Sequence, residues 1–171
     1  MSYPINWNLD SIFPGGIDSP QLADRISDVT AKLPQLESKV AAWAPDHDAP
    51  EFTDFITLWQ LLEDIGKGLA TTSSFVEMIA SADTANLKTG PVQGQLTTLY
   101  TRFQNINNPL AKKLAAMSQA AFDQLTTTSA LSASRFGLQE MRDQAKELLD
   151  DQTETMINDL AVDGFTGWSD H

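Results

Sequence analysis

Apolar residues recur at spacings of three and four along most of the chain, which is the period of an α-helix with one buried face. The members of the first stripe are Leu22, Ile26, Val29, Leu33, Leu36, Val40 and Trp43. Ser19 and Pro20 precede this stripe as an N-cap and a first-turn proline, so a helix is expected to begin there. Pro34 lacks a backbone N–H group and is expected to break or kink this helix.

A second stripe of mostly large apolar residues predicts the strongest amphipathic helix. It consists of Phe52, Phe55, Ile56, Trp59, Leu62, Ile65 and Leu69, and resumes at Phe75, Val76 and Ile79. Residues 44–50, APDHDAP, are typical of a loop. Asp48 and Glu51 have the spacing of a capping box, which predicts that the helix begins at Asp48. Gly66 and Gly68 weaken the pattern because glycine is a poor helix former.

The rest of the chain continues the helical period after a predicted turn at residues 83–91. The stripes are Val92, Leu96, Leu99, Phe103 and Ile106; then Leu110, Leu114, Met117 and Ala121; then Leu138, Met141, Ala145 and Leu148. Asn108-Pro109 is expected to restart a helix. Asp151 and Glu154 form a second capping-box pattern before a last stripe of Met156, Ile157 and Leu160.

No convincing alternation of apolar and polar residues indicates a β-strand, and no fixed-length repeat indicates a solenoid. The pattern therefore predicts an all-α fold, a helical bundle of about six to eight mostly antiparallel helices. Mid-stripe residues should form its core, namely Trp59, Leu62, Leu96, Leu99, Phe103 and Leu160.

The N-terminal segment has apolar residues without helical spacing. Residues 1–18 include Trp7, Leu9, Ile12 and Phe13, too many for a free tail. We predict that residues 1–18 form an extended arm packed on the helices, and that residues 19–171 form one helical domain.

The chain is acidic, with a formal net charge of -12, and it contains no cysteine. The charge disfavours nucleic acid and anionic membrane surfaces as partners, because both carry negative charge. The lack of cysteine removes disulfides, cysteine-rich zinc sites and thiol catalysis. Residues 1–18 do not resemble a secretory signal, and no apolar run is long enough to span a membrane. A cytoplasmic location is expected.

No set of residues in the sequence has the spacing of a catalytic or metal site. The only histidines are His47 and His171, and the His-Glu-x-x-His pattern of zinc peptidases is absent. His47 is expected to be a solvated loop residue, with a metal ligand as the less favoured alternative. Residues 66–68, Gly-Lys-Gly, differ from a phosphate-binding loop because glycine follows the lysine. Asp150 and Asp151 fit helix-end groups better than an acid–base pair. We assign no catalytic, cofactor-binding or metal-ligating residue.

Three segments resemble the N-terminal region of oligoendopeptidase F-like zinc metallopeptidases, of the thimet-oligopeptidase-like superfamily. The opening has Trp7 and Leu9 followed by an acidic and hydrophobic Phe-Pro step at Asp10, Ile12, Phe13 and Pro14. A small-Asp-Thr turn follows at Ala82, Asp83 and Thr84. The strongest match lies in residues 136–168, carried by Leu138, Glu140, Arg142, Leu148, Leu149, Glu154, Ile157, Leu160, Gly164 and Trp168.

The resemblance implies that this chain is a helical N-terminal lobe forming one wall of a deep cleft in a zinc endopeptidase that cuts short peptides. The catalytic domain would follow His171 and would hold zinc through two histidines and a glutamate. Phe165 and Trp168 would then be the interface to that missing domain. The chain alone is expected to be inactive and to self-associate through these two aromatic residues. The alternative is a free-standing helical interaction module that binds a partner helix.

Overall fold

A computed structural model of the chain describes residues 9–148, and these residues are all helices, turns and loops. The elements in chain order are η1 (Leu9–Ser11), η2 (Gly16–Asp18), α1 (Pro20–Ala42), α2 (Pro45–Asp48), α3 (Thr53–Ala82), α4 (Thr89–Ala116), α5 (Gln119–Thr127) and η3 (Ser132–Ser134). Residues 135–148 are also helical. The predicted all-α helical bundle is confirmed.

The chain divides into two compact units, each with its own set of helices. Among the described residues, unit 1 holds residues 9–43 and 53–107, and unit 2 holds residues 44–52 and 108–148.

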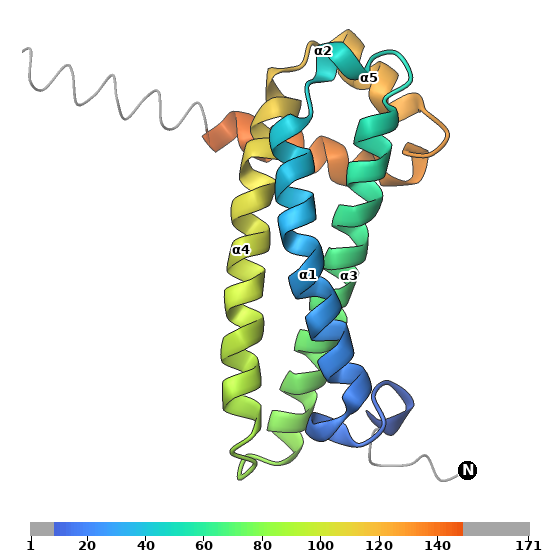
Figure 1. Ribbon diagram of the computed structural model, residues 1–171. Coiled ribbons are helices and arrows are strands. Elements are labelled where there is room, and N and C mark those ends of the chain that lie inside the picture. Colours follow the sequence, from blue (N-terminus) through green and yellow to red (C-terminus); the bar gives the residue numbers. More distant parts are fainter. Residues whose placement is uncertain (1–8, 149–171) are drawn as a thin grey trace, which may run out of the picture. The chain divides into compact units, whose positions relative to one another are not determined.

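Unit 1 is built from α1, α3 and the part of α4 before Asn108, which lie side by side with successive helices antiparallel (Figure 1). The predicted stripes face its interior, and α1 buries Leu22, Ile26, Val29, Leu33, Leu36 and Val40. Five of the six predicted core residues are confirmed as buried: Trp59, Leu62, Leu96, Leu99 and Phe103. The sixth, Leu160, lies outside the described residues. Aromatic contacts add to this core, with the Trp43 and Phe55 ring centroids 4.7 Å apart.

The prolines do not interrupt the helices, so the predicted breaks are wrong. α1 continues through Pro34, and α4 continues through Pro109 to Ala116. Each proline removes one backbone donor. On either side of Pro34, Leu33 and Leu36 are fully buried, so the buried face of the helix continues past the proline.

The capping-box prediction for α3 is also wrong. Asp48 is the last residue of α2, a single helical turn inside the predicted loop, and its carbonyl oxygen accepts from the Phe52 N–H at 2.7 Å. Phe52 is fully buried and has a φ of 51°, a conformation that bulky residues rarely adopt. α3 therefore begins only at Thr53.

The described part of the N-terminal arm is wound into two short 3-10 turns rather than extended. Gly15 and Gly16 have φ values of 93° and 64°, which glycine adopts without strain, and the Gly15 N–H donates to Asp10 Oδ1. Phe13 is buried edge-on against Phe75, with ring centroids 4.9 Å apart. Leu9 is half-buried and Ile12 is 42% exposed, so the predicted packing is confirmed for Phe13 and wrong for Ile12. Trp7 lies outside the described residues.

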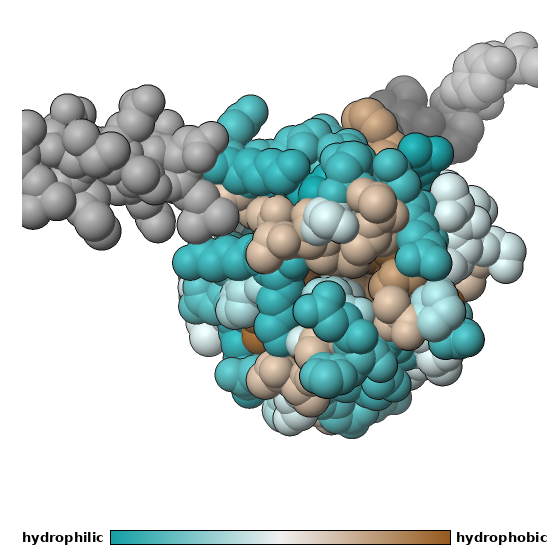
Figure 2. All heavy atoms as spheres, turned by 90° about the horizontal axis from the view of Figure 1, so that it is seen from above, coloured by the Kyte–Doolittle hydropathy of each residue, from teal (hydrophilic) through white to brown (hydrophobic). Residues whose placement is uncertain are grey.

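Apolar side chains are also present at the surface of the described residues. Figure 2 shows apolar patches separated by hydrophilic ones on the face that it presents. Phe136 and Leu148, both in the helix at residues 135–148, are 76% and 62% exposed.

Candidate functional site

The best-defined polar site in unit 2 is a buried arginine, Arg142, with only 2% of its surface exposed. Its Nε donates to the Leu114 carbonyl oxygen at 3.1 Å, and Nη2 donates to the Met117 carbonyl oxygen at 2.6 Å. Nη1 donates to Gln119 Oε1 at 2.7 Å. We call these contacts the Arg142 clasp. It ties residues 135–148 to the end of α4 and the start of α5.

The clasp places a cation at the C-terminal end of α4, where the Leu114 carbonyl oxygen accepts from the Met117 N–H as well as from Arg142, and Met117 lies just past the last helical residue. The last carbonyl groups of a helix have no partner inside the helix and carry a partial negative charge, which attracts a cation. The guanidinium also lies 4.4 Å from the centroid of the Phe122 ring. Among residues 9–148, the clasp uses neutral oxygens and no carboxylate.

In the sequence, Arg142 stood out only through the family resemblance, and its buried role was missed. The buried positions of this helix are Leu138, Arg142 and Ala145, at spacings of four and three. Met141, which the predicted stripe included, is only half-buried. The spacing alone could therefore have predicted the clasp, since an arginine that shares a helix face with buried residues is expected to be a buried cation with hydrogen-bond partners.

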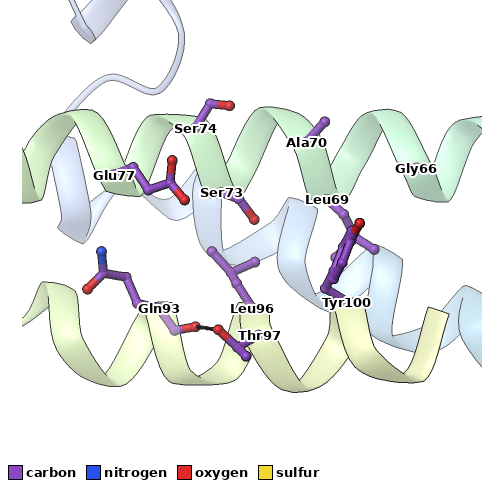
Figure 3. A pocket seen from close by; sticks show the side chains of 10 residues that line it. All are labelled: Gly66, Leu69, Ala70, Ser73, Ser74, Glu77, Gln93, Leu96, Thr97 and Tyr100. Carbon is purple, nitrogen blue, oxygen red and sulfur yellow. Dashed lines mark hydrogen bonds between the residues drawn. The ribbon is translucent and has the colours of Figure 1, made fainter. Parts of the chain in front are cut away.

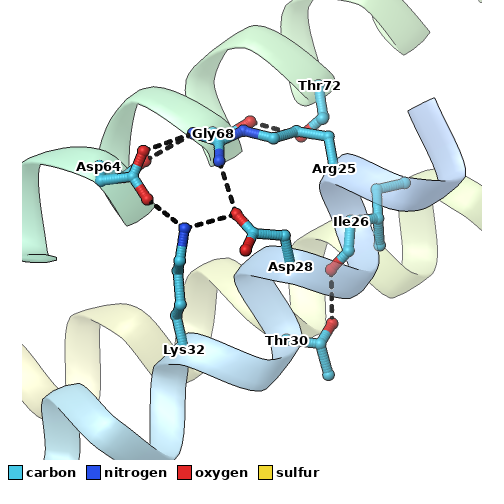
Figure 4. A network of polar contacts seen from close by, with 8 residues as sticks. All are labelled: Arg25, Ile26, Asp28, Thr30, Lys32, Asp64, Gly68 and Thr72. Atoms are coloured by element: carbon cyan, nitrogen blue, oxygen red, sulfur yellow. Dashed lines mark hydrogen bonds and ion pairs between the residues drawn. The ribbon is translucent and has the colours of Figure 1, made fainter. Parts of the chain in front are cut away.

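Four charged side chains form a network between α1 and α3 in unit 1 (Figure 4). Arg25 Nη1 lies 2.7 Å from Asp28 Oδ2, and its Nη2 lies 3.0 Å from Asp64 Oδ1. Lys32 Nζ lies 2.7 Å from both Asp28 Oδ2 and Asp64 Oδ2. Arg25 Nη2 also donates to the Asp64 carbonyl oxygen. Arg25 and Lys32 of α1 thus both form ion pairs with Asp64 of α3.

The network shifts two pKa values in opposite directions. Hydrogen bonds from Lys32 and then Arg25 lower the pKa of the Asp64 carboxyl, although partial burial opposes this effect. Hydrogen bonds to Asp28 and then Asp64 raise the pKa of the Lys32 ammonium. Both shifts favour the charged forms, so the ion pairs persist over a wider pH range than isolated groups would allow.

A groove of about 570 Å³ lies between α3 and α4 in unit 1 (Figure 3). We call it the α3–α4 groove. It is lined by Gly66, Leu69, Ala70, Ser73, Ser74, Glu77, Gln93, Leu96, Thr97 and Tyr100. Leu69 and Leu96 supply apolar surface, and Glu77 is the only charged residue in this lining.

The residues that the sequence offered as candidates for chemistry do not come together. His47 is exposed in α2, and residues 66–68 lie within α3 rather than in a loop. The predicted interface residues Phe165 and Trp168 lie outside the described residues, as do His171, Asp150 and Asp151.

The described residues do not provide a metal site. Residues 9–148 contain no group of three or more histidine or carboxylate side chains placed to hold a metal ion. No helix within this part of the chain is both long and apolar enough to cross a membrane.

Comparison with protein families gives one match. Residues 113–171, about a third of the chain, match the family model described as Oligopeptidase F, an N-terminal domain of peptidases. This match includes the Arg142 clasp and the segment in which the sequence resemblance was strongest. It supports an oligoendopeptidase F-like N-terminal domain, so the predicted resemblance is confirmed over these residues. Comparisons with curated proteins and with solved structures gave no significant match.

Proposed function

We propose that this chain is the N-terminal helical lobe of an oligoendopeptidase F-like zinc metalloendopeptidase that acts on short peptides. The observation that carries the proposal is the family match over residues 113–171. The described part of that region is ordered around a buried cation, which suits a rigid structural role.

In this proposal the lobe contributes shape rather than chemistry. Its helices form one wall of a cleft that admits short peptides and excludes folded proteins. Zinc would be held by the catalytic domain of the longer protein and would activate a water molecule there. The described residues offer no ligand set for zinc, so no catalytic step is assigned to them. Phe165 and Trp168 remain our proposed contacts with that domain.

The test compares this 171-residue chain with the longer protein encoded in the same reading frame. Fluorogenic peptides of increasing length are incubated with each protein, with zinc and with a chelator. We expect the longer protein to cleave short peptides in a zinc-dependent manner and the chain alone to cleave none. Zinc-dependent cleavage by the chain alone would contradict the proposal. A natural polypeptide that ends at His171 would instead favour the free-standing helical interaction module.

A further inference from the structure

A second groove, of about 470 Å³, lies in unit 1 between α1 and the start of α4. We call it the α1–α4 groove. Its apolar lining comes from three elements, with Leu22 and Ile26 on α1, Val92 on α4 and Ile17 on η2. The other lining residues are small or polar, namely Ala23, Ser27, Thr30, Ala31 and Gln95. None of the residues that line this groove is charged.

The α1 side of the groove is open because its outward-facing residues are small. Ala23, Ser27 and Ala31 recur at spacings of four, which places them on one face of the helix, and all three are exposed. The nearby charged residues Arg25 and Lys32 pair with Asp64 of α3 and do not line the groove. A charged occupant would lose hydration against this surface without gaining a partner, so the groove favours an uncharged, apolar one.

Residues 1–8, MSYPINWN, have this composition. Three of them, Tyr3, Ile5 and Trp7, are large and apolar, and none has a charged side chain, although the chain as a whole has a net charge of -12. Burial of these side chains against the apolar lining would remove their surface from water, which is favourable.

The segment is also attached within reach of the groove. Two successive turns separate its attachment point, Leu9, from Ile17 in the lining. The Ile12 N–H donates to the Leu9 carbonyl oxygen, and the Gly16 N–H donates to the Phe13 carbonyl oxygen. Each turn brings residues three apart to within about 7 Å, so Leu9 lies within roughly 22 Å of Ile17. Eight extended residues span up to about 26–29 Å.

We propose that residues 1–8 fill the α1–α4 groove, with the side chains of Tyr3, Ile5 and Trp7 against its apolar lining. Because the segment is tethered, its local concentration is high, and it occupies the groove in preference to a free ligand or a second copy of the chain. It thereby acts as a strap that closes this face of unit 1. The proposal does not depend on the chain's role as a peptidase lobe.

The test is an NMR measurement on the 171-residue chain, with the free peptide MSYPINWN as the reference. We expect NOEs from the aromatic protons of Tyr3 and Trp7 to methyl groups of the groove. The two rings should also have chemical shifts that differ from those in the free peptide. Ring shifts equal to those of the peptide would overturn the proposal, and so would NOEs from both rings to a different surface.

Ser27→Glu places a charge in the groove and should weaken these NOEs and move the ring shifts toward those of the free peptide. Ser38→Glu is the matched control, because Ser38 is an exposed serine of α1 that does not line the groove. It should leave both unchanged. Equal effects of the two substitutions would overturn the proposal.

Groove resonances that move on dilution, while the rings keep the shifts of the free peptide, would assign the groove to a second copy of the chain and would also overturn the proposal. None of these outcomes bears on peptide cleavage by the longer protein, so the two proposals fail separately.

Discussion

Gly68 determines how closely α1 and α3 can approach. A Cβ atom at this position would lie 2.7 Å from Val29 Cγ2 and 2.9 Å from Arg25 Nη2. Val29 is β-branched and buried, so it has little freedom to move. The sequence pattern marked Gly68 only as a weak point in a helix, because a helical pattern does not reveal which residue of another helix faces it.

Gly68→Ala should destabilise the protein although alanine is the better helix former. We expect a loss of about 1–3 kcal/mol in the free energy of unfolding, from overpacking against Val29. Gly94→Ala in α4 is the matched control, because nothing lies within 4 Å of its Cβ position. That substitution should stabilise by about 0.5–1 kcal/mol through helix propensity. Urea denaturation of both variants measures the difference, and two changes of the same sign would contradict the close packing.

Asp64 should make stability depend on pH in a defined direction. Its pKa is lower in the folded chain, so its contribution is present at neutral pH and is lost as pH falls through the folded-state pKa. The pKa of Lys32 is raised in the folded chain, so the contribution of Lys32 to stability is lost at alkaline pH, as the pH rises through that pKa.

Asp64→Asn should therefore cost up to about 1 kcal/mol between roughly pH 5 and 9, because the group is partly exposed. The difference from the unsubstituted chain should shrink as the pH falls below that range. Thermal melts of both proteins across the pH series measure this difference. A difference that stays constant down to about pH 2 would show that the ion pairs do not carry the effect.

At the scale of elements, periodicity predicted which faces are buried, and the structure confirms this for α1 and for the part of α4 that begins at Leu96. Helix ends were harder to predict. α1 begins at Pro20 after Ser19, as expected, yet the Ser19 hydroxyl makes no cap bond and is buried without a partner among the described residues. Capping residues and prolines are poor guides at such positions, because contacts between helices decide where a helix continues or stops.

The Arg142 clasp should be the main support of the connection between α4, α5 and residues 135–148. Arg142→Met leaves the Met117 carbonyl group without its described donor, which costs about 1–3 kcal/mol, and also removes the bonds to Gln119 and to the Leu114 carbonyl, although the latter keeps the Met117 N–H. We expect a total loss of about 2–4 kcal/mol in urea denaturation. Arg135→Met is the control, since Arg135 is 59% exposed and its nearest ion-pair contact is 4.0 Å, and it should cost under about 0.5 kcal/mol. Equal effects would show that the clasp does not support this connection.

The N-terminal arm should be held to unit 1 mainly by Phe13. Phe13→Ala removes a buried ring that packs on Phe75, with an expected cost of about 3–5 kcal/mol. Ile12→Ala, at the neighbouring exposed position, should cost less than about 1 kcal/mol. Limited proteolysis should cut the arm faster in the Phe13 variant only. Similar cutting rates in both variants would mean that Phe13 does not anchor the arm.

For the whole molecule, the sequence predicted the fold class and the family resemblance but not the arrangement of polar groups. The α3–α4 groove brings together Ser73, Glu77 and Gln93 from two helices, and nothing in the local pattern indicates that they share a site. The Arg25, Asp28, Lys32 and Asp64 network was missed for the same reason, because α1 and α3 contribute its members separately.

The central proposal is that this chain is the N-terminal lobe of a larger zinc peptidase. The most direct measurement is the intact mass of the natural protein, isolated with an antibody raised against residues 9–148, together with its zinc content. We predict a polypeptide several hundred residues longer than this chain that carries bound zinc. A metal-free natural polypeptide that ends at His171 would contradict it.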